Sequence, residues 1–435
     1  RLGPPDSTPE FAFFPWLAML FSAGMGIGLV FFGVAEPVLH FLQPPTAEPL
    51  SVAAAREAMR YSIFHWGLHA WAIYAVLGLA LALFHFRLGQ PLAIRSTLAP
   101  LLGRHTHRWP GKSIDVLAVL GTLFGLATSL GLGAAQISAG LQQLFGVSEG
   151  LATQIWVIVV ITFFATLSLV LGLEKGIRRL SELNLVLAGL LLLFVLLIGP
   201  TAVLLRGIVD NLGNYLQNLP AMSLSTHPFR GLDWQKSWTI FYWSWWLSWA
   251  PFVGVFIARI SRGRTLREFV VGVLLLPTLL SLVWFGVFGG AALHIELEDS
   301  DALSGVVSEN SALAIYVLLE HLPFAELSSF LAMLLVAVFF ITSSDSGSFV
   351  VDMLTSGGNP NPPVVQRIFW ASLEGLIAIM LLLTGGLAAL QAGAVSMGLP
   401  FALVLLGVAV ALVRQLRIEM RAVDKSVQPR SIGER

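Results

Sequence analysis

The sequence predicts an all-α polytopic membrane protein with a core of ten spanning helices. Of its 435 residues, 56% are hydrophobic and 11% are charged, whereas a soluble domain carries about 25% charged residues. Apolar stretches long enough to cross a bilayer recur along the whole chain. The formal net charge is +0, which excludes a basic field for nucleic acid. The chain has no cysteine, which excludes disulfides and thiolate metal sites.

Ten apolar segments qualify as spans. Their ranges are 11–41, 53–86, 113–145, 150–173, 183–206, 237–259, 268–293, 325–354, 364–386 and 392–414. Several exceed the roughly 20 residues that a bilayer requires, so we expect tilted or kinked helices. Because the sequence starts with Arg1 and turns apolar at Phe11, we expect the natural chain to begin earlier.

The distribution of Lys and Arg predicts the orientation. Basic residues gather after the second, fourth and sixth spans and after the last one, for example Arg95, Arg178, Arg264 and Arg417. The seventh loop has acidic residues but no Lys or Arg. We therefore expect the even loops and both ends of this multi-pass chain on the cytoplasmic side of the cell membrane.

Three loop segments resemble helices that lie along the membrane surface rather than spans. They are 91–105, 207–220 and 310–322, which are either amphipathic or too short to cross. Pro110 with Gly111, and the run 357–363, predict tight connections.

Ten spans divide into two sets of five. An odd number of spans in each half places the halves in opposite orientations, as in an inverted repeat with its site near the midplane. We expect a first repeat at 1–206, an extracellular amphipathic connection at 207–236, a second repeat at 237–414 and a cytoplasmic tail at 415–435.

Aromatic residues cluster in two spans. They are Trp243, Trp245, Trp246 and Trp249 in the sixth span, and Trp66 and Tyr74 in the second. The spacings of three, four and eight place members on common helix faces. They could be packing residues or an interfacial belt, but belt tryptophans sit at span ends and Trp246 and Trp249 lie mid-span. Since indole faces attract quaternary ammonium groups, we favour a ligand box.

Three glycines interrupt the first span, at Gly24, Gly26 and Gly28. Small residues allow close helix packing, and they also weaken a helix so that carbonyls become available. Both interpretations can hold together. An unwound segment here would offer the carbonyls of Ser22 and Met25 to a cation.

The eighth span ends in a polar run that includes Thr342, Ser343 and Asp345. The hydroxyls are hard oxygen donors for a small cation, although they could instead bond to carbonyls of their own helix. Asp345 is either a functional intramembrane acid or a residue near the cytoplasmic helix end. Thr122 in the third span is a weak signal by itself.

Enzyme chemistry is not indicated. His65 and His69 stand at i and i+4, but no third zinc ligand follows, so we interpret them as packed histidines. The glycines of the first span lack the βαβ context of a dinucleotide site, and no catalytic triad stands out. We expect no enzyme activity, no cofactor and no structural metal.

The segments that carry these features resemble the betaine/choline/carnitine transporter family. They are Gly24 to Pro37, His65 to Tyr74 and Phe241 to Arg264. The bacterial choline transporters of that family are the most similar, on three stretches: Gly121 to Gly133, Arg178 to Asn184 and Phe252 to Gly263.

The resemblance implies a twelve-span protein, usually a homotrimer in membrane lipid, with a leucine-transporter-like core of two inverted five-helix repeats. This chain then corresponds to the core without the first two spans. The family holds a trimethylammonium group in an aromatic box. The matching positions are Trp66, Tyr74, Trp245, Trp246 and Trp249, with Met25 and Gly26 beside them and Trp243 along the adjacent pathway.

The resemblance also implies ion sites. Sodium-coupled members hold an ion at positions that match Ser22, Met25, Phe339, Thr342 and Ser343. A second site matches Thr122 and Phe252, but Leu126 replaces its second threonine. The sequence has no basic residue where sodium-independent exchangers place one.

These features predict a secondary active importer of choline for osmoprotection, driven by symport of a cation. The choline-transporter resemblance slightly favours a proton, with Asp345 as its carrier, whereas the oxygens around Thr342 favour sodium. One alternative is a glycine betaine importer, for which we identify no carboxylate donor in the sequence. Another is an ion channel, although no polar pore or charged ring is evident.

Overall fold

The computed structural model is helical throughout its described part. Backbone is described for residues 1–435 except 25, 172, 227–230, 360–361 and 428–435, and the side chains of 21–24, 168–178 and 422–427 are also outside the description. No strand occurs in the described residues. The all-α prediction is therefore confirmed.

Helices of the first half correspond to the first five predicted spans. They are α1 (Phe13–Gly24), α2 (Gly26–Leu42), α3 (Val52–Trp66), α4 (Leu68–Ala82), η1 (Leu83–Arg87), α7 (Trp109–Phe145), α8 (Leu151–Leu171) and α9 (Leu173–Ile198). The spans of the second half are α12 (Phe241–Ile260), α13 (Leu266–Glu298), α16 (Ala325–Thr355) and α17 (Val364–Val427).

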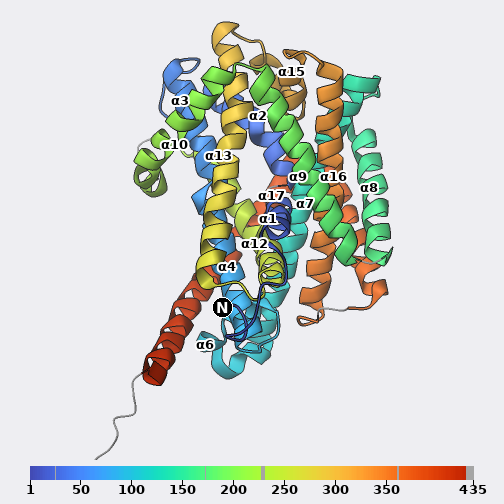
Figure 1. Cartoon of the computed structure of the whole chain (residues 1–435). Coiled ribbons are helices and arrows are strands. Elements are labelled where there is room, and N and C mark those ends of the chain that lie inside the picture. Colours follow the sequence, from blue (N-terminus) through green and yellow to red (C-terminus); the bar gives the residue numbers. More distant parts are fainter. Residues whose placement is uncertain (25, 172, 227–230, 360–361, 428–435) are drawn as a thin grey trace, which may run out of the picture.

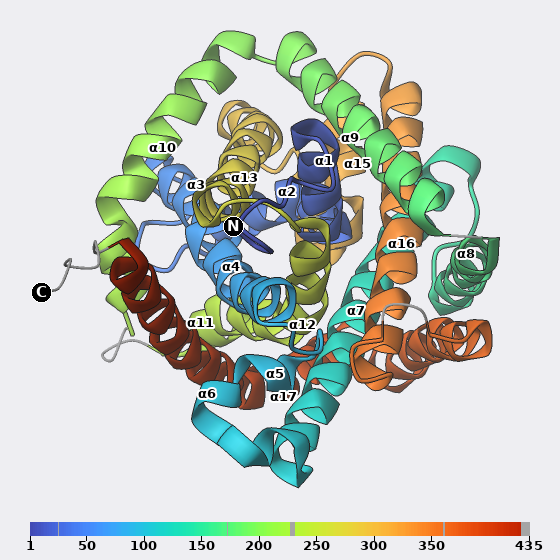
Figure 2. The same cartoon turned by 60° about the horizontal axis from the view of Figure 1, so that its bottom comes forward.

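Shorter helices connect them. They are α5 (Ile94–Thr97), α6 (Ala99–Leu102), η2 (Gly103–His107), α11 (Asp233–Gln235), η3 (Lys236–Ile240), α14 (Ser304–Glu309), η4 (Ser311–Leu313) and α15 (Ala314–Glu320). A longer one, α10 (Thr201–Leu224), curves around the outside of the molecule (Figure 2). All three predicted surface segments are thus helical.

Within the described residues, 7 helices are long and apolar enough to cross a membrane. Ten segments were expected, and three features account for the difference. The first span is divided between α1 and α2, and the described part of α8 falls short of the required length. α17 joins two predicted spans across a kink at Gly385 and Gly386.

The helix ends differ from the expected span ends at two places. α9 begins at Leu173, earlier than the expected span start at 183, and ends at Ile198, because Gly199 and Pro200 separate it from α10. Residues 415–427 continue α17 as helix.

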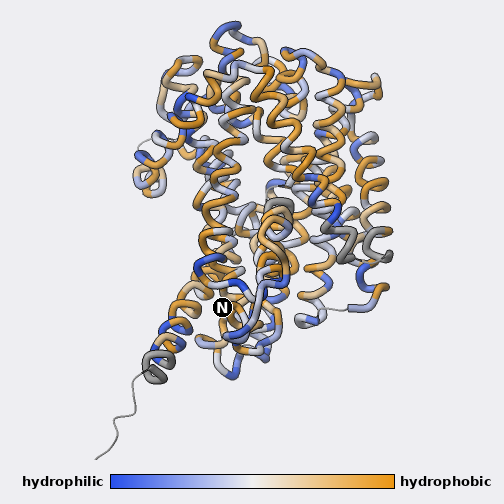
Figure 3. Tube along the Cα trace, viewed as in Figure 1, coloured by the Kyte–Doolittle hydropathy of each residue, from blue (hydrophilic) through white to orange (hydrophobic). Residues whose placement is uncertain are grey.

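The helices pack around a central group made of α2, α4, α7, α12 and α16. α12 lies against α4, α7 and α17, and α2 lies against α3 and α13. Apolar residues dominate the middle of the molecule, and hydrophilic residues concentrate toward its two ends (Figure 3). The N-terminus, α6 and the end of α17 lie at one end of the molecule and α15 lies at the other (Figure 1).

Two helix breaks shape the interior. α2 starts at Gly26, whose φ of +33° lies outside the helical range. α3 ends and α4 starts at Gly67, where a Cβ atom would lie 2.5 Å from the Ile63 carbonyl oxygen. Beside this break the Leu68 N–H donates to the Tyr215 hydroxyl of α10 at 3.2 Å. A backbone N–H released at this break is therefore paired with a side chain of another helix.

Candidate substrate and ion sites

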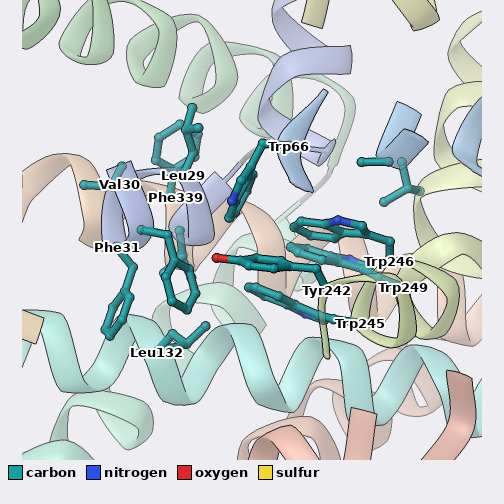
Figure 4. Packing of buried hydrophobic residues seen from close by; sticks show 14 of the residues in the cluster. Leu29, Val30, Phe31, Trp66, Leu132, Tyr242, Trp245, Trp246, Trp249 and Phe339 are labelled. Atoms are coloured by element: carbon teal, nitrogen blue, oxygen red, sulfur yellow. The ribbon is translucent and has the colours of Figure 1, made fainter. Parts of the chain in front are cut away.

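The tryptophans of α12 form one continuous stack. Trp245 lies against Trp246 at a ring-centroid separation of 4.8 Å and against Trp249 at 5.7 Å, and both pairs are nearly parallel. Trp249 stacks in turn on Phe252 at 6.0 Å. This arrangement follows from the helical spacings of one, three and four along α12. Figure 4 shows the stack beside Tyr242.

Trp66 closes one side of the stack. Its ring meets Trp246 edge to face at 4.8 Å and Trp245 at 6.3 Å. Tyr74 approaches Trp246 from α4 at 6.4 Å. All five rings are at most 2% exposed. The structure therefore brings the five predicted box residues together in a closed, buried cluster.

Trp243 lies outside this cluster. It is half-buried on another face of α12, where it stacks on His69 at 5.4 Å and contacts Phe64 at 5.2 Å. Sequence reasoning missed Trp71, which is buried in α4 and packs edge to face on Tyr74 at 5.5 Å. Its spacing of three from Tyr74 was the available signal.

Glycine at position 28 allows the rings to approach α2. A Cβ atom there would lie 2.7 Å from Cη2 of Trp66 and 2.9 Å from Cη2 of Trp245. Neither distance is compatible with a side chain, so Gly28 serves close helix packing, which was one of the two expected roles of the glycines. Gly26 has the positive φ of a broken helix, and its neighbour Met25 lies outside the described residues.

Three polar atoms around the box have no hydrogen-bond partner among the described residues. They are the Tyr74 hydroxyl and the indole Nε1 atoms of Trp245 and Trp249, all fully buried. Buried donors are normally satisfied, and leaving one unpaired costs about 1–3 kcal/mol. The cluster thus contains unused donors beside its aromatic faces.

The expected cation segment lies in α16, and its side chains are buried. Thr342 donates to the Val338 and Phe339 carbonyl oxygens at 3.0 Å each, and it accepts from Asn184 Nδ2 of α9 at 3.0 Å. The Thr342 hydroxyl therefore bonds to carbonyls of its own helix, and it also connects α16 to α9. Its role as an ion ligand stays a prediction. Sequence reasoning did not assign Asn184 a role.

Ser343 differs from its neighbour. Its hydroxyl is buried and has no partner among the described residues. It lies 3.4 Å from the position that a Cβ on Gly26 would occupy, so it faces the broken end of α2. The Ser22 side chain and all of Met25 are outside the description, so the expected carbonyl ligands are not part of this geometry.

Asp345 is fully buried within α16, ten residues before the helix ends at Thr355. The helix-end interpretation is therefore not supported. One turn further along, Ser348 donates to Glu374 Oε2 of α17 at 2.9 Å, and Glu374 is also fully buried. This places two acids within the packed interior.

The weak second ion site has its two members on packed helices. Thr122 of α7 donates to the Ala118 carbonyl of its own helix at 2.8 Å. Ser248 of α12 donates to the Gly121 carbonyl at 2.8 Å, which joins α7 to the helix that carries Phe252. Leu126 is fully buried and fills the volume beside Gly347. The apolar side chain of Leu126 thus occupies the position at which the second ion site requires a threonine hydroxyl.

A buried acid with two histidines was not anticipated. Glu36, His40 and His65 place potential ligand atoms within 4.8 Å of one another. His65 Nδ1 lies 2.6 Å from Glu36 Oε1, whereas two ligands of a tetrahedral zinc ion are roughly 3.3 Å apart. The distances are those of hydrogen bonds, so this cluster is a polar network in the structure.

The sequence profile of the betaine/carnitine/choline family transporters matches residues 1–421. The chain belongs to the betaine/carnitine/choline transporter family. This transporter is 48% identical over 447 residues to a glycine betaine/proline/choline transporter of Vibrio parahaemolyticus, with 98% of this chain and 80% of that one covered. It is 46% identical to a glycine betaine transporter of Bacillus subtilis, with 99% and 85% covered.

An uncharacterised transporter of Mycobacterium tuberculosis is 49% identical, with 98% of this chain and 73% of that one covered. Membership confirms the family resemblance, places the chain among multi-pass transporters rather than enzymes, and sets aside the ion-channel alternative.

Among solved structures, a manganese transporter of Eremococcus coleocola aligns with a TM-score of 0.55. The two share 16% sequence identity, and the alignment covers 93% of this chain and 81% of that one. At this identity the similarity concerns the fold alone. It supports the predicted leucine-transporter-like architecture. The repeat boundaries stay predictions.

Proposed function

We propose that the transporter imports a trimethylammonium solute, with glycine betaine as its first substrate and choline as the second. The buried aromatic box is the observation that carries this proposal. Indole faces attract a quaternary ammonium and supply no acceptor for the N–H groups of a primary amine. Five such rings at most 2% exposed suit a cation without hydrogen-bond donors.

Glycine betaine takes precedence over the choline expected from sequence for two reasons. The relatives from Vibrio parahaemolyticus and Bacillus subtilis both carry glycine betaine in their names, and only the first also carries choline. The unused donors at Tyr74, Trp245 and Trp249 are the kind of group that a carboxylate requires. Sequence reasoning had identified no such donor.

Sodium is our proposed co-substrate, bound between α2 and α16. The buried Ser343 hydroxyl faces Gly26 without a partner among the described residues, and a hydroxyl is a hard oxygen donor suited to this ion. The Phe339 carbonyl and the Thr342 hydroxyl lie on the same helix turn. A proton carried by Asp345 is the second candidate, supported by the complete burial of that acid.

Equilibrium binding to the purified transporter tests the substrate class. Intrinsic fluorescence suits the measurement because four of the five box residues are tryptophans. We expect glycine betaine and choline to bind at least tenfold more tightly than glycine and ethanolamine, which lack the three methyl groups. Equal affinity for glycine and glycine betaine would contradict the aromatic-box assignment. Tight binding of choline with weak binding of glycine betaine would reverse the order of the two substrates.

A further inference from the structure

Glu36 is a fully buried carboxylate in the middle of the transporter that neither substrate nor ion assignment uses. It lies on α2, two turns beyond Gly28, and its exposed fraction is 0%. A buried charge is costly unless hydrogen bonds replace its hydration. The placement therefore calls for a reason beyond packing.

Four side chains converge on this carboxylate. Its Oε1 atom lies 2.6 Å from His65 Nδ1 and 3.2 Å from His40 Nε2. Its Oε2 atom accepts from Trp66 Nε1 at 2.9 Å and from the Tyr242 hydroxyl at 2.5 Å. Each oxygen thus has two neighbours, which matches the acceptor capacity of an ionised carboxylate.

Two of these donors belong to the aromatic assembly. Trp66 is a wall of the box, and its indole N–H points to Glu36 while its ring edge meets Trp246. Tyr242 lies between the carboxylate and the stack, 5.6 Å from Trp66 and 5.7 Å from Trp246. Charge-assisted hydrogen bonds of this kind are roughly twice as strong as neutral ones and fix ring orientation.

His65 connects Glu36 to the same box through a second set of contacts. His65 contacts Glu36 through Nδ1, and its backbone carbonyl accepts from Trp246 Nε1 at 2.9 Å. The His65 ring also stacks on Tyr242 at 4.8 Å. A single carboxylate on α2 therefore connects α3 and α12 at the points where each contributes a box ring.

We propose that Glu36 is a positioning residue for substrate binding, which acts through Trp66 and Tyr242 to hold the box in its binding geometry. Glu36 is bonded to the N–H edge of the Trp66 indole, so this hydrogen bond does not use the ring face. This inference rests on the proposed function, because it assigns Glu36 a role in affinity for the trimethylammonium solute.

Glu36→Gln tests the proposal in the full-length transporter in proteoliposomes. The amide keeps the size of the side chain but carries no charge, so the hydrogen bonds from Trp66 and Tyr242 lose their charge-assisted strength even where the amide N–H groups face the two histidines. We expect the KM for glycine betaine, and the Kd from tryptophan fluorescence, to rise about tenfold or more while the maximal rate per folded transporter changes less than threefold.

Glu57→Gln is the matched control. Glu57 is a buried glutamate of α3, 3% exposed, which accepts from the Thr46 and Ala47 backbone N–H groups and contacts no box ring. We expect its KM to match the wild type. An equal increase of the KM for glycine betaine in both variants would overturn the proposal. It would mean that loss of any buried carboxylate weakens substrate binding.

A double-mutant cycle with Trp66→Phe identifies the route. Phenylalanine keeps an aromatic face but has no N–H to donate. If Glu36 acts through this indole, Glu36→Gln should raise the KM clearly less in the Trp66→Phe background than in the wild type. Full additivity would contradict action through Trp66.

Tyr242→Phe keeps the proposal testable if Glu36→Gln fails to fold. It removes one donor and leaves the ring, and we expect a KM increase of about threefold to tenfold. A wild-type KM in Tyr242→Phe, or in a folded Glu36→Gln, would overturn the inference while the wild-type transporter still accumulates substrate. Absence of any uptake by the wild type would instead refute the proposed function.

Discussion

The Trp246 indole N–H donates to the backbone carbonyl oxygen of His65 at 2.9 Å. The last carbonyls of a helix lack partners within it, and α3 ends one residue later at Trp66. The Ser281 hydroxyl of α13 donates in the same way to the Trp66 carbonyl at 3.0 Å. The break at Gly67 thus supplies acceptors that fix α12 and α13 against the box.

Replacing Trp246 or Trp249 by alanine should weaken substrate binding. Each removes one π-face, worth about 0.5–2 kcal/mol, and admits water to a dry site. We expect the Kd for glycine betaine to rise by about twofold to thirtyfold in both variants, measured by calorimetry on purified protein. Trp243→Ala is the control, since Trp243 packs on His69 outside the cluster. Retained affinity in both box variants would refute the assignment.

Gly28→Ala should disturb the box without removing any ring. The added methyl would lie 2.7 Å from Trp66 and 2.9 Å from Trp245, and overpacking of this kind costs about 1–3 kcal/mol. We expect the Kd for glycine betaine to rise about tenfold. Gly189→Ala in α9 is the matched control because no atom lies within 4 Å of its added Cβ. Equal behaviour of both variants would show that close approach at Gly28 is unimportant.

Ser343→Ala should weaken the coupling ion while the substrate contacts stay. It removes an oxygen from the proposed sodium site, and even indirect ligand losses reduce metal affinity about tenfold. We therefore expect about tenfold more sodium for half-maximal uptake and partial recovery at saturating sodium. Ser328→Ala is the control, because within the described residues the Ser328 hydroxyl bonds to the Phe324 and Ala325 carbonyls alone, and it should leave the sodium requirement unchanged. A proton-driven transporter would show no shift in either variant.

The absence of native cysteine permits a direct topology measurement. Arg104→Cys in η2 and Glu309→Cys in α14 both alter exposed residues. The predicted orientation places Arg104 in the cytoplasm and Glu309 outside. In intact cells an impermeant maleimide should label Glu309→Cys alone, and lysis should expose both. Labelling of Arg104→Cys from outside would reverse the predicted orientation.

Much of the fold could be predicted because hydropathy and segment length are local properties. Chain-breaking residues defined the surface helices, although the end of the fifth span was missed at Gly199 and Pro200. The basic residues Lys175, Arg178 and Arg179 predicted a loop, but the backbone of α9 is already helical there. Helices extend past an apolar segment into charged residues, so charge alone does not mark a helix end.

The box could be predicted from helical spacing and family resemblance, but its supports could not. Glu36 precedes a proline inside an apolar span, and nothing nearby indicates that Trp66 and Tyr242 donate to it. Asn184 donates a hydrogen bond to Thr342, and the two residues are 158 positions apart in the sequence. Contacts between distant segments depend on packing angles, which one sequence does not encode in a readable pattern.

Uptake by the purified transporter in proteoliposomes tests the central claim most directly. Labelled glycine betaine or choline is supplied outside vesicles that carry either an inward sodium gradient or an inward proton gradient. We predict accumulation of glycine betaine above the external concentration under the sodium gradient, and its loss when an ionophore removes that gradient. Failure to accumulate either trimethylammonium solute under any imposed gradient would contradict the account.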